Sequence, residues 1–211
     1  MAPGEVVLHD TTLYLASKRL FDLAVGLLVF ALVIPIVPLI ALMIRLDSPG
    51  PVFYRQDRVG RGGRLFRFYK FRSMYQEADR RLHELQGRNE QDGPVFKIKA
   101  DPRITPVGQF LRRSSMDEIP QLLNVLRGEM SIVGPRPPLP VEVARYQPWH
   151  RRRLDVKPGI TCLWQIAGRS HIGFEEWMRL DMEYLRTRSL RTDLAIFAKT
   201  LPAVMARRGA Y

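Results

Sequence analysis

Two acidic side chains stand next to each other in a strongly basic chain. Asp117 and Glu118 lie in the stretch SSMDEIPQLLNVL, residues 114–126. The 211 residues include 33 Lys and Arg against 21 Asp and Glu, which gives a net charge of +12. Adjacent carboxylates at the start of a helix can cap the helix, attack a substrate as a nucleophile, or bind a metal ion. The pair is therefore the first candidate for chemistry.

The commonest role of such acids is helix capping. Ser115-x-x-Glu118 matches a capping box, whereas the alternative register makes Asp117 the N-cap and puts Pro120 in the first turn. Both registers place the two carboxylates at a helix N-terminus, where the local field favours their ionised form. The same placement suits a nucleophile or a metal ligand. Because neighbouring residues on a helix point roughly 100° apart, we expect two different roles rather than a matched pair acting on one atom.

Cations flank this pair in the sequence. Arg112 precedes it and Arg136 follows it, and alternation along a predicted strand over 65–72 places Lys70 and Arg72 on one face. Guanidinium groups match phosphate oxygens, and two carboxylates with water suit Mg²⁺ that bridges to phosphate. The set indicates phosphoryl transfer. Two other interpretations of the strand remain: its cations are simply solvated, or the strand is a basic and aromatic platform for nucleic acid.

A long apolar stretch lies near the N-terminus. Residues 20–44 are 25 residues with one charge, Asp22, and so exceed the roughly 20 residues that cross a bilayer. The run is too long for a cleavable signal peptide. Pro35 and Pro38 can kink or break a helix there. A kinked spanning helix is one interpretation. We expect the other, a re-entrant hairpin, because it keeps the basic residues on both sides of the stretch in the cytosol.

The rest of the chain predicts a mixed domain. We expect strands over 52–56 and 65–72, and helices over 74–85, 107–113, 119–126, 141–147, 174–185 and 192–205. Residues 132–140 are too rich in proline for a regular element and predict a rigid loop that presents Arg136. Residues 148–153 lie at lipid headgroups or are solvated. The apolar stripe over 192–205 belongs to the core or to the membrane interface. The single cysteine, Cys162, excludes an intrachain disulfide.

Several stretches together resemble a known family. They are KRLFDL, LDSPGPVFYRQDRVG, FYKFRSM, DPRITPVGQFLRRSSMDEIPQLLNVLRGEMSIVGPRP, KPGITCLWQIAGR and the final GAY. With them, the sequence from Lys18 to Tyr211 resembles the bacterial sugar transferases, the monotopic polyprenyl-phosphate hexose-1-phosphate transferases (phosphoglycosyl transferases). The 17 residues before Lys18 suggest a minimal catalytic-domain form.

The resemblance implies a mechanism. The Asp of an Asp-Glu dyad, here Asp117-Glu118, attacks the β-phosphate of a nucleotide-diphosphate sugar, and the phospho-sugar then passes to a polyprenyl phosphate. Mg²⁺ is required, and Asp117 and Glu118 are the expected metal ligands. The resemblance also implies a helix break at Pro35. It implies substrate-binding roles for Lys70, Arg72, Arg112, Pro135, Arg136, Pro137, Gln165 and Arg169.

These observations predict an α+β, mainly helical protein. We expect a lead-in over 1–17, a re-entrant membrane helix-break-helix over 18–46, and a small cytosolic catalytic domain over 47–211 with a short β-hairpin and interfacial amphipathic helices. The expected partners are a nucleotide-diphosphate sugar, undecaprenyl or another polyprenyl phosphate, and membrane lipids, with a second copy of the chain as a candidate, but no nucleic acid. The expected location is the cytosolic face of the bacterial inner membrane. A membrane-tethered nucleic-acid-binding module is the alternative, and a non-catalytic scaffold that recruits glycosyltransferases is a weaker one.

Overall fold

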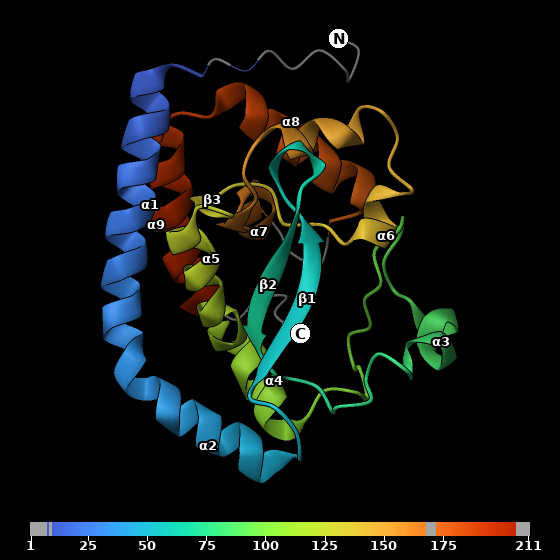
Figure 1. Ribbon diagram of the computed structural model, residues 1–211. Coiled ribbons are helices and arrows are strands. Elements are labelled where there is room, and N and C mark those ends of the chain that lie inside the picture. Colours follow the sequence, from blue (N-terminus) through green and yellow to red (C-terminus); the bar gives the residue numbers. More distant parts are fainter. Residues whose placement is uncertain (1–7, 9, 168–171, 206–211) are drawn as a thin grey trace.

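The computed structural model describes residues 8, 10–167 and 172–205, and its longest element is a bent helix (Figure 1). α1 (Thr12–Val33) begins after Thr11, whose hydroxyl accepts a hydrogen bond from the Tyr14 amide at 3.1 Å. A short 3-10 turn, η1 (Ile34–Ile36), contains Pro35 and joins α1 to α2 (Val37–Asp47). Proline cannot donate a helical hydrogen bond, so the regular helix is interrupted at this turn and α2 leaves in a new direction.

The outer surface of the bent helix is apolar. Thr12–Asp47 is long and apolar enough to cross a membrane, and only 11% of its most apolar stretch is buried. Exposed leucines lie along both halves, at Leu20, Leu27, Leu28, Leu32, Leu39, Leu42 and Leu46. An apolar surface of this extent indicates association with a membrane.

The start of the bent helix is anchored to the rest of the molecule. Lys18 Nζ donates to the Val133 carbonyl at 3.0 Å and to Asp193 Oδ2 at 2.8 Å. Asp22 is buried and accepts a hydrogen bond from Ser131 Oγ at 2.8 Å. Lys18 before the apolar stretch and Asp22 within it are therefore bound inside the fold.

A β-hairpin lies at the centre of the molecule (Figure 1). β1 (Phe53–Val59) and β2 (Leu65–Phe71) are antiparallel, and Tyr54 lies opposite Lys70. The turn between them, η2 (Arg61–Gly63), contains a glycine at φ 67° followed by one at φ 78°, backbone conformations that other residues rarely adopt. The predicted hairpin is confirmed, but β1 extends beyond the expected end at residue 56.

Helices surround the hairpin. They are α3 (Leu82–Leu85), η3 (Gln86–Arg88), α4 (Pro106–Arg113), η4 (Met116–Gln121), α5 (Leu122–Arg127), α6 (Pro140–Val143), η5 (His150–Asp155), α7 (Leu163–Ala167), α8 (Phe174–Thr187) and α9 (Leu190–Met205). α1 packs against α5 and α9, and α2 packs against α4. The predicted mainly helical α+β class is thus confirmed.

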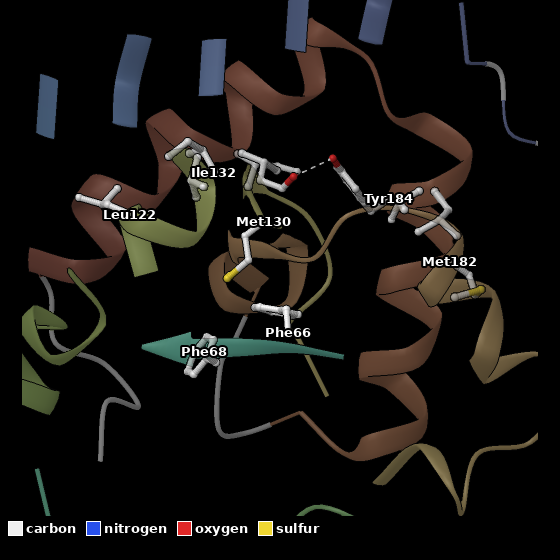
Figure 2. Close-up of a cluster of buried hydrophobic side chains, with 12 residues drawn as sticks. Phe66, Phe68, Leu122, Met130, Ile132, Met182 and Tyr184 are labelled. Atoms are coloured by element: carbon white, nitrogen blue, oxygen red, sulfur yellow. Dashed lines mark hydrogen bonds between the residues drawn. The ribbon is translucent and has the colours of Figure 1, made fainter. Parts of the chain in front are cut away.

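The largest core lies between β2 and the helices (Figure 2). Phe66 and Phe68 come from β2, Ile132 from the segment after α5, and Tyr184 from α8. Tyr184 Oη donates to the Val133 carbonyl at 3.1 Å, so the polar end of this buried ring has a partner. α9 joins the same core through Ile196 and through Phe197 of the predicted stripe, whereas Leu194 of that stripe is 47% exposed.

Four predictions for the soluble part are wrong. The expected helix over 141–147 is found only as the short α6, Pro140–Val143. Residues 74–85 form a helix only over Leu82–Leu85, because residues 103 and 104 hold the start of the segment extended. Part of the predicted loop over 132–140 is a strand: β3 (Ser131–Val133) pairs in parallel with β4 (Gly159–Thr161). Residues 148–153 are not all at the surface, since His150 and Arg153 are buried.

Candidate active site

Asp117 and Glu118 occupy the first turn of η4, between α4 and α5. Ser115 just before this turn adopts a left-handed conformation, at φ 56°, and its side chain makes no capping hydrogen bond. Instead, the Ser115 carbonyl accepts from the Glu118 amide at 3.3 Å. Neither of the two possible registers is found, because Ser115 is the N-cap without a capping side chain, but both carboxylates do lie at the start of a helical segment, as both registers predicted.

Lys70 of β2 brings the two carboxylates together. Its ammonium lies 2.8 Å from Glu118 Oε1 and 3.5 Å from Asp117 Oδ2. The Asp117 side chain is 7% exposed and that of Glu118 is 30% exposed. One carboxylate thus lies deep in the site and the other lies nearer to solvent, although they are neighbours in the sequence.

The two acids differ in their readiness to ionise. Burial raises the pKa of Asp117, and the neighbouring charge of Glu118 adds to that rise against the opposing effects of Lys70 and Arg112. Burial also acts against ionisation of Glu118, but Lys70 and Arg136 outweigh it, so the pKa of Glu118 is lowered. The environment therefore separates the dyad into one acid that holds its proton more tightly and one that stays ionised.

The dyad opens into a cavity of about 890 Å³. Its lining includes eight lysines and arginines against five acidic residues, which favours an anionic ligand. Most of the predicted site residues line this cavity: Lys70, Arg72, Arg112, Asp117, Glu118, Arg136, Pro137 and Gln165. Pro135 does not line it, Pro35 lies at the membrane-helix bend, and Arg169 is outside the described residues.

The predicted cations are held in different ways. Arg112 Nε donates to Ser73 Oγ at 2.9 Å, on the side of the cavity next to Asp117. The Arg136 guanidinium lies over the Trp177 ring, 5.6 Å from its centroid. Arg72 instead donates to backbone carbonyls at the end of α2, including that of Ser48 at 2.7 Å. Its guanidinium is therefore engaged in fixing the chain after the apolar helix.

The loop that carries Arg136 is fixed by the parallel β3–β4 pair. The Gly134 amide donates to Thr161 and the Gly159 amide donates to Pro135, each at 2.9 Å. A Cβ on Gly159 would lie 2.1 Å from the Gly134 nitrogen, so only glycine permits this approach. Backbone pairing, rather than proline content alone, thus directs Arg136 toward the cavity.

Sequence reasoning missed Arg58. It is 8% exposed, lines the cavity, and donates through Nη1 to the Pro137 carbonyl at 3.0 Å. Burial, with a further contribution from the charge of Arg136, lowers the pKa of Arg58 to about 10. The alternation 54, 56, 58 would have placed it on the same face as Tyr54 if the first strand had been extended by two residues.

The donor chemistry of the dyad fits Mg²⁺. Both ligands are carboxylates, and the cavity beside them has room for water and phosphate oxygens, which Mg²⁺ usually retains. Within residues 8, 10–167 and 172–205, no three His, Cys, Asp or Glu side chains gather into a metal-binding group. Asp117 and Glu118 would therefore hold the ion with oxygen atoms that come from water and substrate.

Fold and site together define a membrane-associated domain that presents two carboxylates to an anionic ligand. The family model for bacterial sugar transferases matches residues 13–207. The chain belongs to the bacterial sugar transferase family, as its sequence motifs predict. Membership confirms the enzyme hypothesis at the level of a sugar transferase and disfavours the nucleic-acid-binding module.

Three relatives illustrate the similarity. The galactosyl transferase CpsE of Streptococcus agalactiae is 46% identical over 93% of this chain and 44% of its own length. The exopolysaccharide production protein ExoY of Sinorhizobium fredii is 40% identical over 92% of this chain and 88% of its own length. The undecaprenyl-phosphate galactose phosphotransferase of Salmonella typhimurium is 41% identical over 92% of this chain and 41% of its own length. The chain thus spans less than half of two of these proteins and most of the third.

Proposed function

We propose that this protein transfers a sugar 1-phosphate from a nucleotide-diphosphate sugar, of the UDP class, to undecaprenyl phosphate. The products are a polyprenyl-diphosphate sugar and a nucleoside monophosphate, and the reaction serves synthesis of an exopolysaccharide or related glycoconjugate. The observation that carries the proposal is the Lys70 ammonium between the carboxylates of Asp117 and Glu118, inside a cavity rich in arginine. Relatives named for undecaprenyl-phosphate galactose and glucose-1-phosphate transfer support it.

The first half of the reaction uses Asp117 as the nucleophile. A carboxylate oxygen attacks the β-phosphorus, a P–O bond forms, and the bond from that phosphorus to the oxygen bridging the two phosphates breaks. The nucleoside monophosphate leaves with the bonding electron pair. Lys70, Arg112 and Arg136 neutralise charge on the phosphate oxygens and orient them. Lys70 also keeps Asp117 accessible as an anion by opposing the effect of burial on its pKa.

In the second half, an oxygen of the polyprenyl phosphate attacks the phosphorus held on Asp117. The acyl-phosphate bond breaks, and Asp117 leaves as a carboxylate ready for the next cycle. Glu118 stays ionised and holds Lys70 in position. Mg²⁺, bound by Asp117 and Glu118, would supply further neutralisation of phosphate charge.

We further propose that the bent helix is re-entrant and that the catalytic domain faces the cytosol at the inner membrane. Its support is the attachment of both ends of the helix to one domain: Lys18 binds the Val133 carbonyl at 3.0 Å, and Arg72 binds the Ser48 carbonyl at 2.7 Å. Single cysteines introduced near residues 3 and 48 should both resist a membrane-impermeant thiol reagent added to intact cells. Labelling near residue 3 alone would support a spanning helix instead.

Intact-protein mass spectrometry tests the covalent step directly. The purified full chain with Mg²⁺ and a panel of UDP-sugars, but without lipid acceptor, should gain the mass of one phospho-sugar. Addition of undecaprenyl phosphate should remove this mass and release a lipid-linked sugar. The same experiment with Asp117→Asn should give no adduct. An adduct that persists in this variant would assign the nucleophile to another residue, with Glu118 the first to test.

A further inference from the structure

A second hollow lies beside the candidate active site. It measures about 930 Å³ and runs between α2 and the start of β1. Eight of its ten lining residues are apolar or aromatic, and the remaining two are arginines, Arg45 and Arg55. We refer to this hollow as the α2 groove. An apolar surface edged by two cations matches a molecule with a hydrocarbon chain and an anionic end.

The α2 groove and the catalytic cavity share a wall. Pro51, Phe53 and Tyr54 line both. Successive strand residues point to opposite faces, so Phe53 faces α2 while Tyr54 faces the dyad's side of the hairpin, opposite Lys70. The first residues of β1 and Pro51 before them therefore form a boundary that the groove shares with the cavity of the dyad.

Arg72 holds the segment that leads from the end of α2 into the shared wall. Its guanidinium donates to Ser48 at 2.7 Å, to Ile44 at 3.3 Å and to Pro49. Gly50 follows at φ 123°, and a Cβ there would lie 2.3 Å from Arg72 Nη1, so the segment closes tightly around the guanidinium. This arrangement fixes the end of α2 relative to β2, the strand that carries Lys70.

The surroundings of the groove decide where its occupant comes from. α2 belongs to the helix that is long and apolar enough for a membrane, and Leu39 and Leu46 beside the groove are 58% and 79% exposed. Within the groove, Leu42 is 54% exposed and Phe53 is 40% exposed, the latter stacked on Phe71 at 5.4 Å. An occupant with an apolar chain would reach these side chains from the bilayer rather than from water.

We infer that the α2 groove binds the first isoprene units of the polyprenyl phosphate acceptor and leads its phosphate past Phe53 into the catalytic cavity. This inference rests on the proposed function, which requires a lipid phosphate to reach Asp117. It gives Arg45 and Arg55 the task of attracting the phosphate. It also makes Arg72 a positioning residue for the passage between the two sites.

The test separates the two half-reactions. The full chain is placed in nanodiscs of phosphatidylethanolamine and phosphatidylglycerol, and undecaprenyl phosphate is titrated at saturating UDP-sugar. Leu42→Gln removes an apolar side chain from the groove, and Leu39→Gln makes the same change one turn away on the same helix, outside the groove. Loss of apolar contact in Leu42→Gln should raise the KM for undecaprenyl phosphate about tenfold. Formation of the phospho-sugar adduct without lipid should be unchanged in both variants.

A photoreactive polyprenyl phosphate, with a diazirine in its first isoprene units, tests the same site in the unchanged protein, so no substitution can disturb the fold. It should label peptides from residues 37–55, and undecaprenyl phosphate should compete while phosphatidylglycerol should not. The inference would be overturned if the two leucine variants changed KM equally or if the label appeared outside residues 37–55. It would also be overturned if phosphatidylglycerol competed equally well or if the probe crosslinked two copies of the chain. If the unchanged protein forms no adduct, the proposed function itself fails. If it forms the adduct and Leu42→Gln still binds the acceptor normally, only the groove assignment fails.

Discussion

Two of the sites where opposite charges meet away from water differ in how the charges are matched. Around the dyad, one ammonium, on Lys70, serves two carboxylates at 2.8 Å and 3.5 Å, and its side chain is 25% exposed. Between η5 and α8, the Arg153 guanidinium lies 2.8 Å from Asp181 Oδ2, and both side chains are 1% exposed. Arg153 also donates to the Tyr146 hydroxyl at 2.7 Å and to the Arg136 carbonyl at 3.0 Å.

The difference between these two regions distinguishes charges that hold the fold together from charges that are available to a substrate. The Arg153–Asp181 pair has one charge for one charge, and hydrogen bonds to Tyr146 and to the Arg136 carbonyl hold the guanidinium in place. At the dyad, two negative charges share one Lys70, and burial acts against both. A charge that is matched one to one inside the fold is engaged in holding the fold together, whereas two carboxylates that share one ammonium at a cavity can interact with a substrate. The following predictions test this contrast, from the largest expected effect to the smallest.

Asp117→Asn should reduce turnover by about three orders of magnitude or more, because the variant lacks the attacking charge. Its thermal stability at neutral pH should be unchanged or higher. Burial raises the pKa of Asp117, so the folded state favours the protonated form and ionisation at neutral pH costs stability, which the neutral amide avoids. Nucleoside monophosphate release and a thermal melt measure the two effects. A variant with clearly lower stability and normal turnover would reverse the roles assigned to this carboxylate.

Asp181→Ala should lower the free energy of unfolding by about 3–5 kcal/mol, because it leaves the Arg153 charge buried without a partner. Denaturant unfolding of the full chain in detergent measures the change. Glu176→Ala on the same helix α8 is the matched control, since its ion pair with Arg179 is exposed at the surface. If Asp181→Ala loses activity but keeps its stability, the pair belongs to the site rather than to the scaffold.

Arg136→Ala should weaken use of the nucleotide-sugar by about 1.5–3 kcal/mol in kcat/KM, the typical cost of a lost charge-assisted hydrogen bond. The side chain lines the cavity and lies with its guanidinium over the Trp177 ring, so stability should change little. Initial rates at varied nucleotide-sugar concentration provide the measurement. An equal effect on the polyprenyl phosphate KM would point to a general electrostatic role.

The rate of adduct formation should fall as the pH is lowered, with an apparent pKa above the ordinary value of about 3.9 for an aspartate. The sign follows from the raised pKa of Asp117: the nucleophile is protonated at low pH and becomes reactive as pH rises through that pKa. Single-turnover adduct formation across pH measures it. Glu118→Gln removes a neighbouring negative charge that contributes to the rise and should lower this apparent pKa. An apparent pKa that does not change would exclude coupling within the dyad.

Arg80→Ala should change both activity and stability by less than about 0.5 kcal/mol, because its ion pair with Glu77 is exposed and screened by solvent. The Arg80 side chain is 83% exposed, and the pair is at 3.2 Å. This substitution sets the baseline for removing one positive charge from a chain of net charge +12. A loss of turnover comparable to that of Arg136→Ala would mean that total charge, rather than the cavity, governs substrate binding.

The sequence alone was sufficient for features that depend on neighbouring residues. The apolar stretch, its interruption at Pro35, the hairpin, and the helices over 107–113 and 174–185 follow from hydropathy, proline chemistry and period. Gly128 ends α5 in a left-handed conformation at φ 80°, as expected for a C-terminal glycine. Motif spacing also identified the family and its acid pair. These properties are local, and a short stretch of sequence contains what is needed to infer them.

Only the tertiary structure decided which partner each charged side chain binds. Lys70 lies near the end of β2 and Arg72 directly follows that strand, yet Arg72 binds the end of α2 while Lys70 binds the dyad. The stretch 148–153 contains one His and three Arg in sequence, yet Arg153 is buried against Asp181. β3 is too short to be visible as a strand and exists because β4, 28 residues further on, pairs with it. Each outcome depends on a partner distant in the chain, and pairing energy, desolvation and packing between distant segments are set only when the fold brings them together.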